Sequence, residues 1–140
     1  MPGGLVRVLA GEFKDPQANG VKGFESQYVK TTAYDVSLEA GQEITIPSKE
    51  GETVFVFTLV NGLLVGEESI PPKTAALFSD GDAITVKAGP EGSRFTYYAA
   101  MPLGETVAWG GPIVMNTEEE LQQAFAELED GSFIKDEVYI

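Results

Sequence analysis

The chain has 140 residues, of which 43% are hydrophobic, and its 22 acidic and nine basic residues give a formal net charge of −13. This composition is typical of a globular protein, and the length favours a single domain over residues 1–140. Direct binding to nucleic acid or to an anionic membrane is not expected, because both need a surplus of Lys and Arg.

The chain contains neither cysteine nor histidine. Without cysteine there is no disulfide, no zinc–thiolate site and no thiol nucleophile. Without histidine, the commonest transition-metal ligand and the usual general base near neutral pH are missing. The residues therefore predict no catalytic residue, no transition-metal site and no cofactor. An all-oxygen Ca²⁺ or Mg²⁺ site is the metal option that is left.

The chain begins Met1-Pro2-Gly3-Gly4, with no basic stretch ahead of an apolar one, so no signal peptide is expected. The longest apolar run, residues 54–60, is much shorter than the ~20 residues of a membrane-spanning helix. A cytoplasmic protein without membrane contact is the default expectation.

Short strand-like segments recur along the chain, each bounded by Gly, Pro, Asn or Asp. They are expected at residues 5–10, 25–29, 34–38, 42–47, 53–60, 63–65, 73–78, 83–88 and 93–100. Residues 39–41 and the Asn61-Gly62 pair are typical of hairpin loops, and tight links are expected at 79–82 and 89–92. This spacing predicts an all-β sandwich or barrel.

The segment at 53–60, TVFVFTLV, has apolar residues at both its odd-numbered and its even-numbered positions. Successive side chains of a strand face opposite sides, so its valines point one way and Phe55, Phe57 and Leu59 the other. One face can fill the interior of the fold. The other face needs a cover, either from the predicted helix, from a long loop or from another protein.

The end of the chain changes from strand-like to helical. Thr117 and Glu120 fit a capping box, and acidic residues in the first turn suit the positive end of the helix dipole. Leu121, Ala124, Phe125 and Leu128 fall on one face at helical spacing, and Gly131 can end the helix. We expect one helix over residues 118–129.

Four residues could line a ligand pocket: Tyr97, Tyr98, Arg94 and Trp109. The two tyrosines straddle the faces of one strand, so one of them could lie at a barrel mouth. Core packing of the tyrosines, and an anchoring role for Trp109 between barrel and helix, are the alternatives. Arg7 and Arg94 are the only arginines, and we expect them to pair with carboxylates or to bind an anionic ligand.

Several carboxylates lie near predicted turns, namely Glu67, Glu68, Asp80, Asp82 and Glu91. They could hold a hard cation or act as an acid–base pair. For Asp80-Gly81-Asp82, turn chemistry, in which Asp side chains accept backbone N–H groups, is the better explanation.

Residues 102–125, PLGETVAWGGPIVMNTEEELQQAF, resemble the C-terminal signature of the pirin family, which is close to PL-x-EPVAW-x-GPFVMNT-x-EE-[IL]-QQAF. Residues 131–133 match its Gly-x-Phe ending, and residues 6–12, VRVLAGE, resemble the VRVIAGE segment that opens the pirin C-terminal half. Residues 78–82 and 88–95 resemble its later hairpins. The resemblance covers about residues 5–133 and leaves a tail at 134–140.

The resemblance implies a cupin-type double-stranded β-helix, a jelly-roll-like antiparallel β-barrel with one short C-terminal helix. Pirins resemble pairs of such barrels, with an iron held by three His and one Glu in the N-terminal barrel. None of these ligands maps onto this chain. Where a cupin metal motif would place His-x-His, the sequence has Glu52-Thr53-Val54.

Three functions follow as hypotheses. The first is a non-catalytic, metal-free module that forms a homodimer or binds a pirin N-terminal-like cupin. Its expected interface consists of Phe55, Phe57, Leu59, Leu121 and Phe125. The second is one half of a split dioxygenase of the quercetin 2,3-dioxygenase type, with its iron on a separate chain. The third is a small-ligand-binding barrel.

Overall fold

The computed structural model describes residues 3–14 and 20–135, and it divides the chain into two compact units, Met1–Pro102 and Leu103–Ile140. The single domain expected over residues 1–140 stays a prediction, because two compact units can still work as one domain. Of the tail expected at 134–140, residues 136–140 lie outside the described residues.

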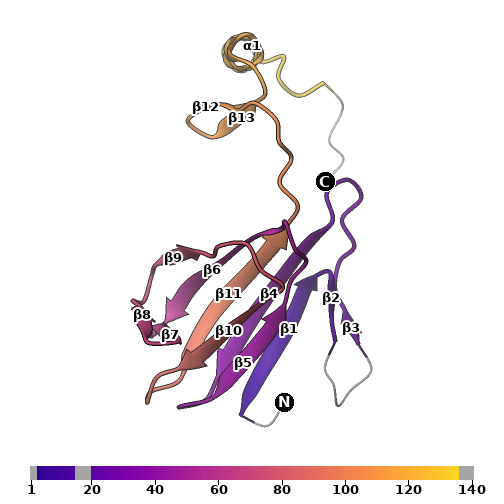
Figure 1. Ribbon diagram of the computed structural model, residues 1–140. Helices are drawn as coiled ribbons and strands as arrows, with labels where there is room; N and C mark the ends of the chain where they lie inside the picture. Colours follow the sequence, from indigo (N-terminus) through magenta and orange to yellow (C-terminus); the bar gives the residue numbers. More distant parts are fainter. Residues whose placement is uncertain (1–2, 15–19, 136–140) are drawn as a thin grey trace. The chain divides into compact units, whose positions relative to one another are not determined.

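Two large antiparallel sheets make up most of the first unit (Figure 1). The five-stranded sheet has the order β1-β4-β11-β6-β9, and the four-stranded sheet has the order β5-β10-β7-β8. The larger sheet contains β1 (Gly4–Ala10), β4 (Thr31–Leu38), β6 (Thr53–Val60), β9 (Ala75–Leu77) and β11 (Ser93–Ala100). The smaller sheet contains β5 (Glu43–Pro47), β7 (Leu63–Val65), β8 (Glu68–Ile70) and β10 (Ala83–Ala88).

Consecutive strands mostly alternate between the two sheets, as in a jelly roll. The chain passes from β4 to β5, from β5 to β6 and from β6 to β7, changing sheet each time. The sheets are not joined into one closed barrel, but the all-β, jelly-roll-like fold is confirmed. The hairpins predicted at 39–41 and at Asn61-Gly62 are wrong in one respect. Both segments reverse the chain, yet the strands that they join pair with other partners.

The Asn61-Gly62 turn lies where the chain passes from β6 in the larger sheet to β7 in the smaller sheet. Asn61 has a φ of 55°, a conformation that asparagine tolerates better than most residues. Its side-chain amide donates to the carbonyls of Glu91 and Gly92, both at 3.2 Å, in the turn between β10 and β11. The side chain therefore ties together two turns at the same end of the unit.

The strand predicted at 25–29 is wrong. Ser26 donates to the Val29 carbonyl and accepts from the Thr31 amide at 3.1 Å, so local side-chain bonds replace sheet pairing here. Two short strands, β2 (Glu12–Phe13) and β3 (Val21–Lys22), pair with each other just before this segment. Neither these two strands nor β8 was predicted.

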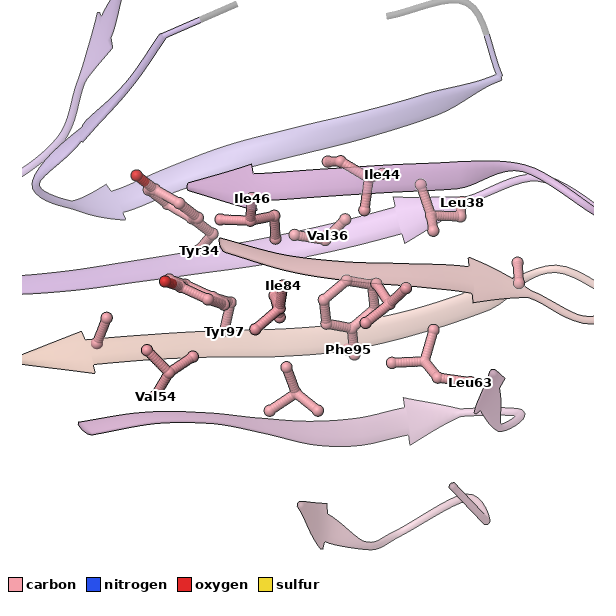
Figure 2. Packing of buried hydrophobic residues seen from close by; sticks show 14 of the residues in the cluster. Tyr34, Val36, Leu38, Ile44, Ile46, Val54, Leu63, Ile84, Phe95 and Tyr97 are labelled. Carbon is pink, nitrogen blue, oxygen red and sulfur yellow. The ribbon is translucent and has the colours of Figure 1, made fainter. Parts of the chain in front are cut away.

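The core of the first unit lies between the two sheets (Figure 2). Buried side chains of β6 and β11 alternate with more exposed ones, which is the burial pattern that a half-covered strand requires, whereas residues 33–36 of β4 are all buried. Tyr34 and Tyr97 stack in this core with ring centroids 5.3 Å apart. The fully buried residues with the largest side chains are Tyr97, Phe95, Ile46, Leu63, Val36, Val56, Val86 and Thr58.

The second unit is a β-hairpin that packs on a helix. The hairpin consists of β12 (Ala108–Gly110) and β13 (Ile113–Met115), and the helix is α1 (Glu118–Asp130). The predicted capping box is confirmed, because the Glu120 amide donates to Thr117 Oγ1 at 3.2 Å and the Thr117 amide donates to Glu120 Oε2 at 3.0 Å. Gly131 ends the helix with a φ of 81°, as expected.

Leu121 and Ala124 of α1 pack with Ile113 in a small core of their own. Gly110 allows the helix to come this close, because a Cβ built there would lie 2.9 Å from Phe125 Cε2. In the part of the chain that the structure describes, α1 is the one α-helix, and it is too short and too polar to cross a membrane.

A Gly110→Val substitution should loosen the second unit, because the added side chain would collide with the ring of Phe125. We expect a loss of about 1–3 kcal/mol in the stability of this unit, the usual cost of overpacking. The fluorescence of Trp109, the only tryptophan, reports on its unfolding. Gly89→Val is the matched control, since a Cβ there meets nothing within 4 Å. An equal response of the two variants would contradict the packing role of Gly110.

Candidate functional site

The candidate site is the outer face of the five-stranded sheet, the face turned away from the four-stranded sheet. Strand register places Tyr98, Phe55 and Leu77 in one cross-strand row. The next row contains Arg7, Asp35, Thr96, Phe57 and Ala75. These side chains, together with Leu5, Arg94 and Leu59, are called the outer face below.

Aromatic and aliphatic side chains make up one half of the outer face. Phe55 stacks on Tyr98 with ring centroids 4.9 Å apart, and Leu77 next to Phe55 is 73% exposed. Phe57 and Leu59 are half-buried. The prediction that Phe55 and Phe57 point away from Val54 and Val56 is confirmed, because the two valines are buried in the core. The outer face thus carries apolar area that the described residues leave partly open.

A buried carboxylate with two arginines makes up the other half. The Arg94 guanidinium donates to both oxygens of Asp35, from Nε at 2.9 Å and from the terminal nitrogen Nη2 at 2.7 Å. Arg7 also contacts this carboxylate, at 3.5 Å. The prediction that both arginines pair with carboxylates is confirmed. Asp35 is 8% exposed, and the guanidinium of Arg94 holds the pKa of its carboxyl below the usual 3.8.

Asp35 was not among the predicted site residues. Two features of the sequence could have pointed to it. Asp35 is the single acidic residue inside the strand segment 34–38, and the two arginines of the chain also lie within apolar strands. A buried carboxylate needs a paired cation, so an acidic residue in one apolar strand and arginines in two others are expected to pair with each other. Sequence spacing alone does not show which of the 22 acidic residues the arginines select.

The three residues of the predicted ligand pocket that lie in the first unit do not share one face of the sheet. Tyr97 is fully buried in the core, while Tyr98 and Arg94 lie on the opposite face of the same strand. Arg94 lines a cavity of about 520 Å³ with residues of the turns at 39–40 and 90–92. Trp109 belongs to the second unit, where it is 75% exposed and donates to the Gly111 carbonyl at 2.7 Å.

The helix residues of the predicted interface differ in exposure. Leu121 is 5% exposed and packs in the core of the second unit, so it supports the helix rather than offering a surface. Phe125 is 39% exposed beside it. On the hairpin, Trp109 and Val114 are opposite each other, and both side chains are largely exposed.

The residues present do not fit the iron that the pirin resemblance implies. At the position of a cupin His-x-His motif, the side chain of Val54 is buried among apolar residues of the core. The chain has no imidazole at all, and the described residues contain no cluster of three carboxylates that could hold a metal ion. Asp80, one of the turn carboxylates, instead accepts from the amides of Gly51 and Gly81, at 2.7 and 3.1 Å.

An Asp35→Asn substitution should destabilise the fold by about 1–2 kcal/mol at neutral pH, because Arg94 loses its charged hydrogen-bond partner. The pKa of Asp35 is lowered in the folded state, so its contribution is present above pH 3.8 and is lost as the pH falls through the folded-state pKa. Urea unfolding of wild type and variant should therefore converge in acid. The control Asp82→Asn changes an exposed carboxylate. A pH-independent difference for Asp35→Asn would refute the ion-pair explanation.

Comparison with known proteins supports the pirin resemblance along most of the chain. The family described as the Pirin C-terminal cupin domain matches residues 33–134. Pirin from Mus musculus and pirin from Homo sapiens are each 33% identical to this chain over 127 residues, which cover 87% of the chain and 42% of either relative. 

The structure also superimposes on a quercetin 2,3-dioxygenase from Acinetobacter baumannii with a TM-score of 0.82 and 30% identity. The match covers 94% of this chain and 44% of that protein, so the chain spans less than half the length of these relatives. A second quercetin 2,3-dioxygenase from the same organism, 15% identical with a TM-score of 0.77, shows the same fold. With the two-sheet architecture and the family match over residues 33–134, the chain belongs to the pirin family, in which it corresponds to the C-terminal cupin domain.

Proposed function

We propose that this chain is a non-catalytic cupin module that works by protein association through the outer face. The observation that carries the proposal is the stacked Phe55–Tyr98 pair beside Leu77, which leaves aromatic and aliphatic surface in contact with solvent. Large apolar patches on globular proteins usually mark contact surfaces. The chain lacks His and Cys, so contact is better supported than chemistry as its task.

The composition of the outer face suits a protein partner. Aromatic residues and arginine are enriched in interfaces, whereas lysine is depleted there. The face combines Phe55, Phe57 and Tyr98 with Arg7 and Arg94, the only arginines of the chain. Both guanidinium groups are about half exposed, with one side held by Asp35. They can therefore donate to a partner without leaving the Asp35 carboxylate unpaired.

The partner that we propose is a second cupin domain. The relatives are more than twice as long as the matched region, so in them this domain is one part of a larger protein. For this chain alone, the simplest partner is a second copy that presents the same outer face, because homodimers with twofold symmetry are the commonest oligomers. A stable contact of this kind buries about 800 Å² on each side.

A Phe55→Glu substitution should weaken association at least tenfold, about 1.4 kcal/mol, by placing an unpaired carboxylate within the apolar contact. Sedimentation equilibrium of wild type, Phe55→Glu and the control Thr85→Glu checks this. Thr85 is exposed on the four-stranded sheet, so its substitution adds the same charge on a different surface. Wild type and control should show the dimer mass and Phe55→Glu the monomer mass.

A wild-type monomer at high micromolar concentration would rule out the homodimer. The same experiment with an added pirin-type N-terminal cupin domain then tests the other partner. If neither mixture shows a complex that is sensitive to Phe55→Glu, the outer face is not a docking surface.

A second function is favoured by one observation, the likeness to a solved quercetin 2,3-dioxygenase at 30% identity. In this alternative the chain is one half of a split dioxygenase, and another polypeptide supplies the iron ligands. The outer face then docks onto the domain that holds the metal. This chain would contribute shape and stability but no ligand, because it contains no histidine.

Oxidation of quercetin by an iron-loaded cupin partner, measured with and without this chain, tests the alternative. A split enzyme should gain at least tenfold in rate when wild-type chain is added, and no gain when Phe55→Glu is added. An equal rate with and without the chain would leave association alone as the function.

A further inference from the structure

The lysines of this acidic chain are concentrated at one cavity. Of the nine basic residues, four are lysines that line a single cavity of about 500 Å³ in the first unit. These are Lys14, Lys22, Lys30 and Lys49. Three of the 22 acidic residues line the same cavity, so the balance of charge there is opposite to that of the whole chain. The association proposed for the outer face does not explain why these lysines lie together, because no outer-face residue lines the cavity.

Three separate segments bring these lysines together. Lys14 follows β2 and Lys22 lies in β3, Lys30 precedes β4, and Lys49 follows β5. The segment after β3 returns to β1 through hydrogen bonds, as the amide of Phe24 donates to the Leu9 carbonyl at 2.9 Å.

Gly23 permits this return, because a Cβ there would lie 2.7 Å from the backbone of Leu9. The cavity wall is therefore fixed by backbone packing as well as by side chains. The lysines that project from it are held near one another by the fold of the chain.

Two of the three carboxylates already have partners. Glu25 accepts from Lys30 at 2.8 Å, and Glu52 accepts from the backbone amide of Lys49 at 2.9 Å. Within residues 3–14 and 20–135, the ammonium groups of Lys14, Lys22 and Lys49 make no ion pair. Three positive groups thus face a cavity whose carboxylates are largely engaged, and this arrangement attracts an anion.

The cavity also offers an apolar contact. Phe24 lines it and is 70% exposed, so its ring is open to an apolar ligand. Glu12, another lining residue, accepts from the Tyr34 hydroxyl through its carbonyl at 2.6 Å. Figure 2 shows the hydroxyls of Tyr34 and Tyr97 directed to the same end of the core. The buried Tyr97 hydroxyl has no hydrogen-bond partner among the described residues, but neither tyrosine lines the cavity.

We propose that this cavity binds a small organic anion, with its carboxylate among Lys14, Lys22 and Lys49 and its apolar body against Phe24. The proposal does not depend on the association function, since none of the outer-face residues lines the cavity. Exposed ion pairs are individually weak, so the affinity comes from several lysines acting together, and it falls as salt screens them.

Titration of the ¹⁵N-labelled chain with benzoate, followed by NMR chemical shifts, tests the proposal. Benzoate should give saturable shifts in residues 22–31 and 49–52, whereas benzamide, its neutral isostere, should bind at least tenfold more weakly. The double variant Lys22→Gln/Lys49→Gln should lose benzoate binding at least tenfold. The control Lys73→Gln/Lys87→Gln removes the same charge from lysines outside the cavity, and it should bind as wild type does.

Equal binding of benzoate and benzamide would overturn the proposal, and so would equal binding by the two double variants. Citrate and inorganic phosphate serve as additional probes, and no saturable shift with any of the three anions at millimolar concentration would also overturn it. If the cavity variant does not fold, the wild type decides the question, because added sodium chloride should weaken benzoate binding but leave the benzamide shifts unchanged.

Discussion

The five-stranded sheet carries bulky side chains on both faces, and this constraint shapes most of the molecule. Its inner face packs against the four-stranded sheet through stacked Tyr34 and Tyr97 rings. Its outer face cannot be covered in the same way, because the four-stranded sheet lies on the other side. There the fold places a carboxylate, Asp35, between two arginines, and a stacked aromatic pair beside them. Association through this face is the arrangement that would complete its burial.

Much of the fold could be predicted from sequence because the relevant signals are local. The alternation of β6 fixed the direction of Phe55 and Phe57, and the capping box marked the start of α1 at Thr117. The pirin-like signature in residues 102–125 predicted the family that the comparison then showed. Turn residues also marked where the chain reverses. They did not reveal that consecutive strands belong to different sheets, since a turn dipeptide determines a reversal but not the pairing partners.

The candidate sites were harder to predict because they depend on contacts between distant segments. Asp35 and Arg94 are 59 residues apart, and no spacing rule pairs them. Ser26 turned the segment at 25–29 away from sheet pairing, although its residues suited a strand. The lysines of the cavity come from three segments that lie together where β2 pairs with β3 and the chain returns to β1. For the predicted pocket residues, strand alternation correctly placed Tyr97 and Tyr98 on opposite faces of β11, but it did not show that the Tyr97 face is the core.

The stacked tyrosine pair has a consequence for how this unit reaches its native state. In a metal-binding cupin, part of the interior is held together by coordination bonds. Here, side by side on β4 and β11, two aromatic rings occupy the interior and are stabilised by burial, by stacking and by the hydrogen bond that the Tyr34 hydroxyl donates to the Glu12 carbonyl. The native packing of this part of the interior is therefore complete only when both strands are in place, because each of them supplies one ring of the stacked pair.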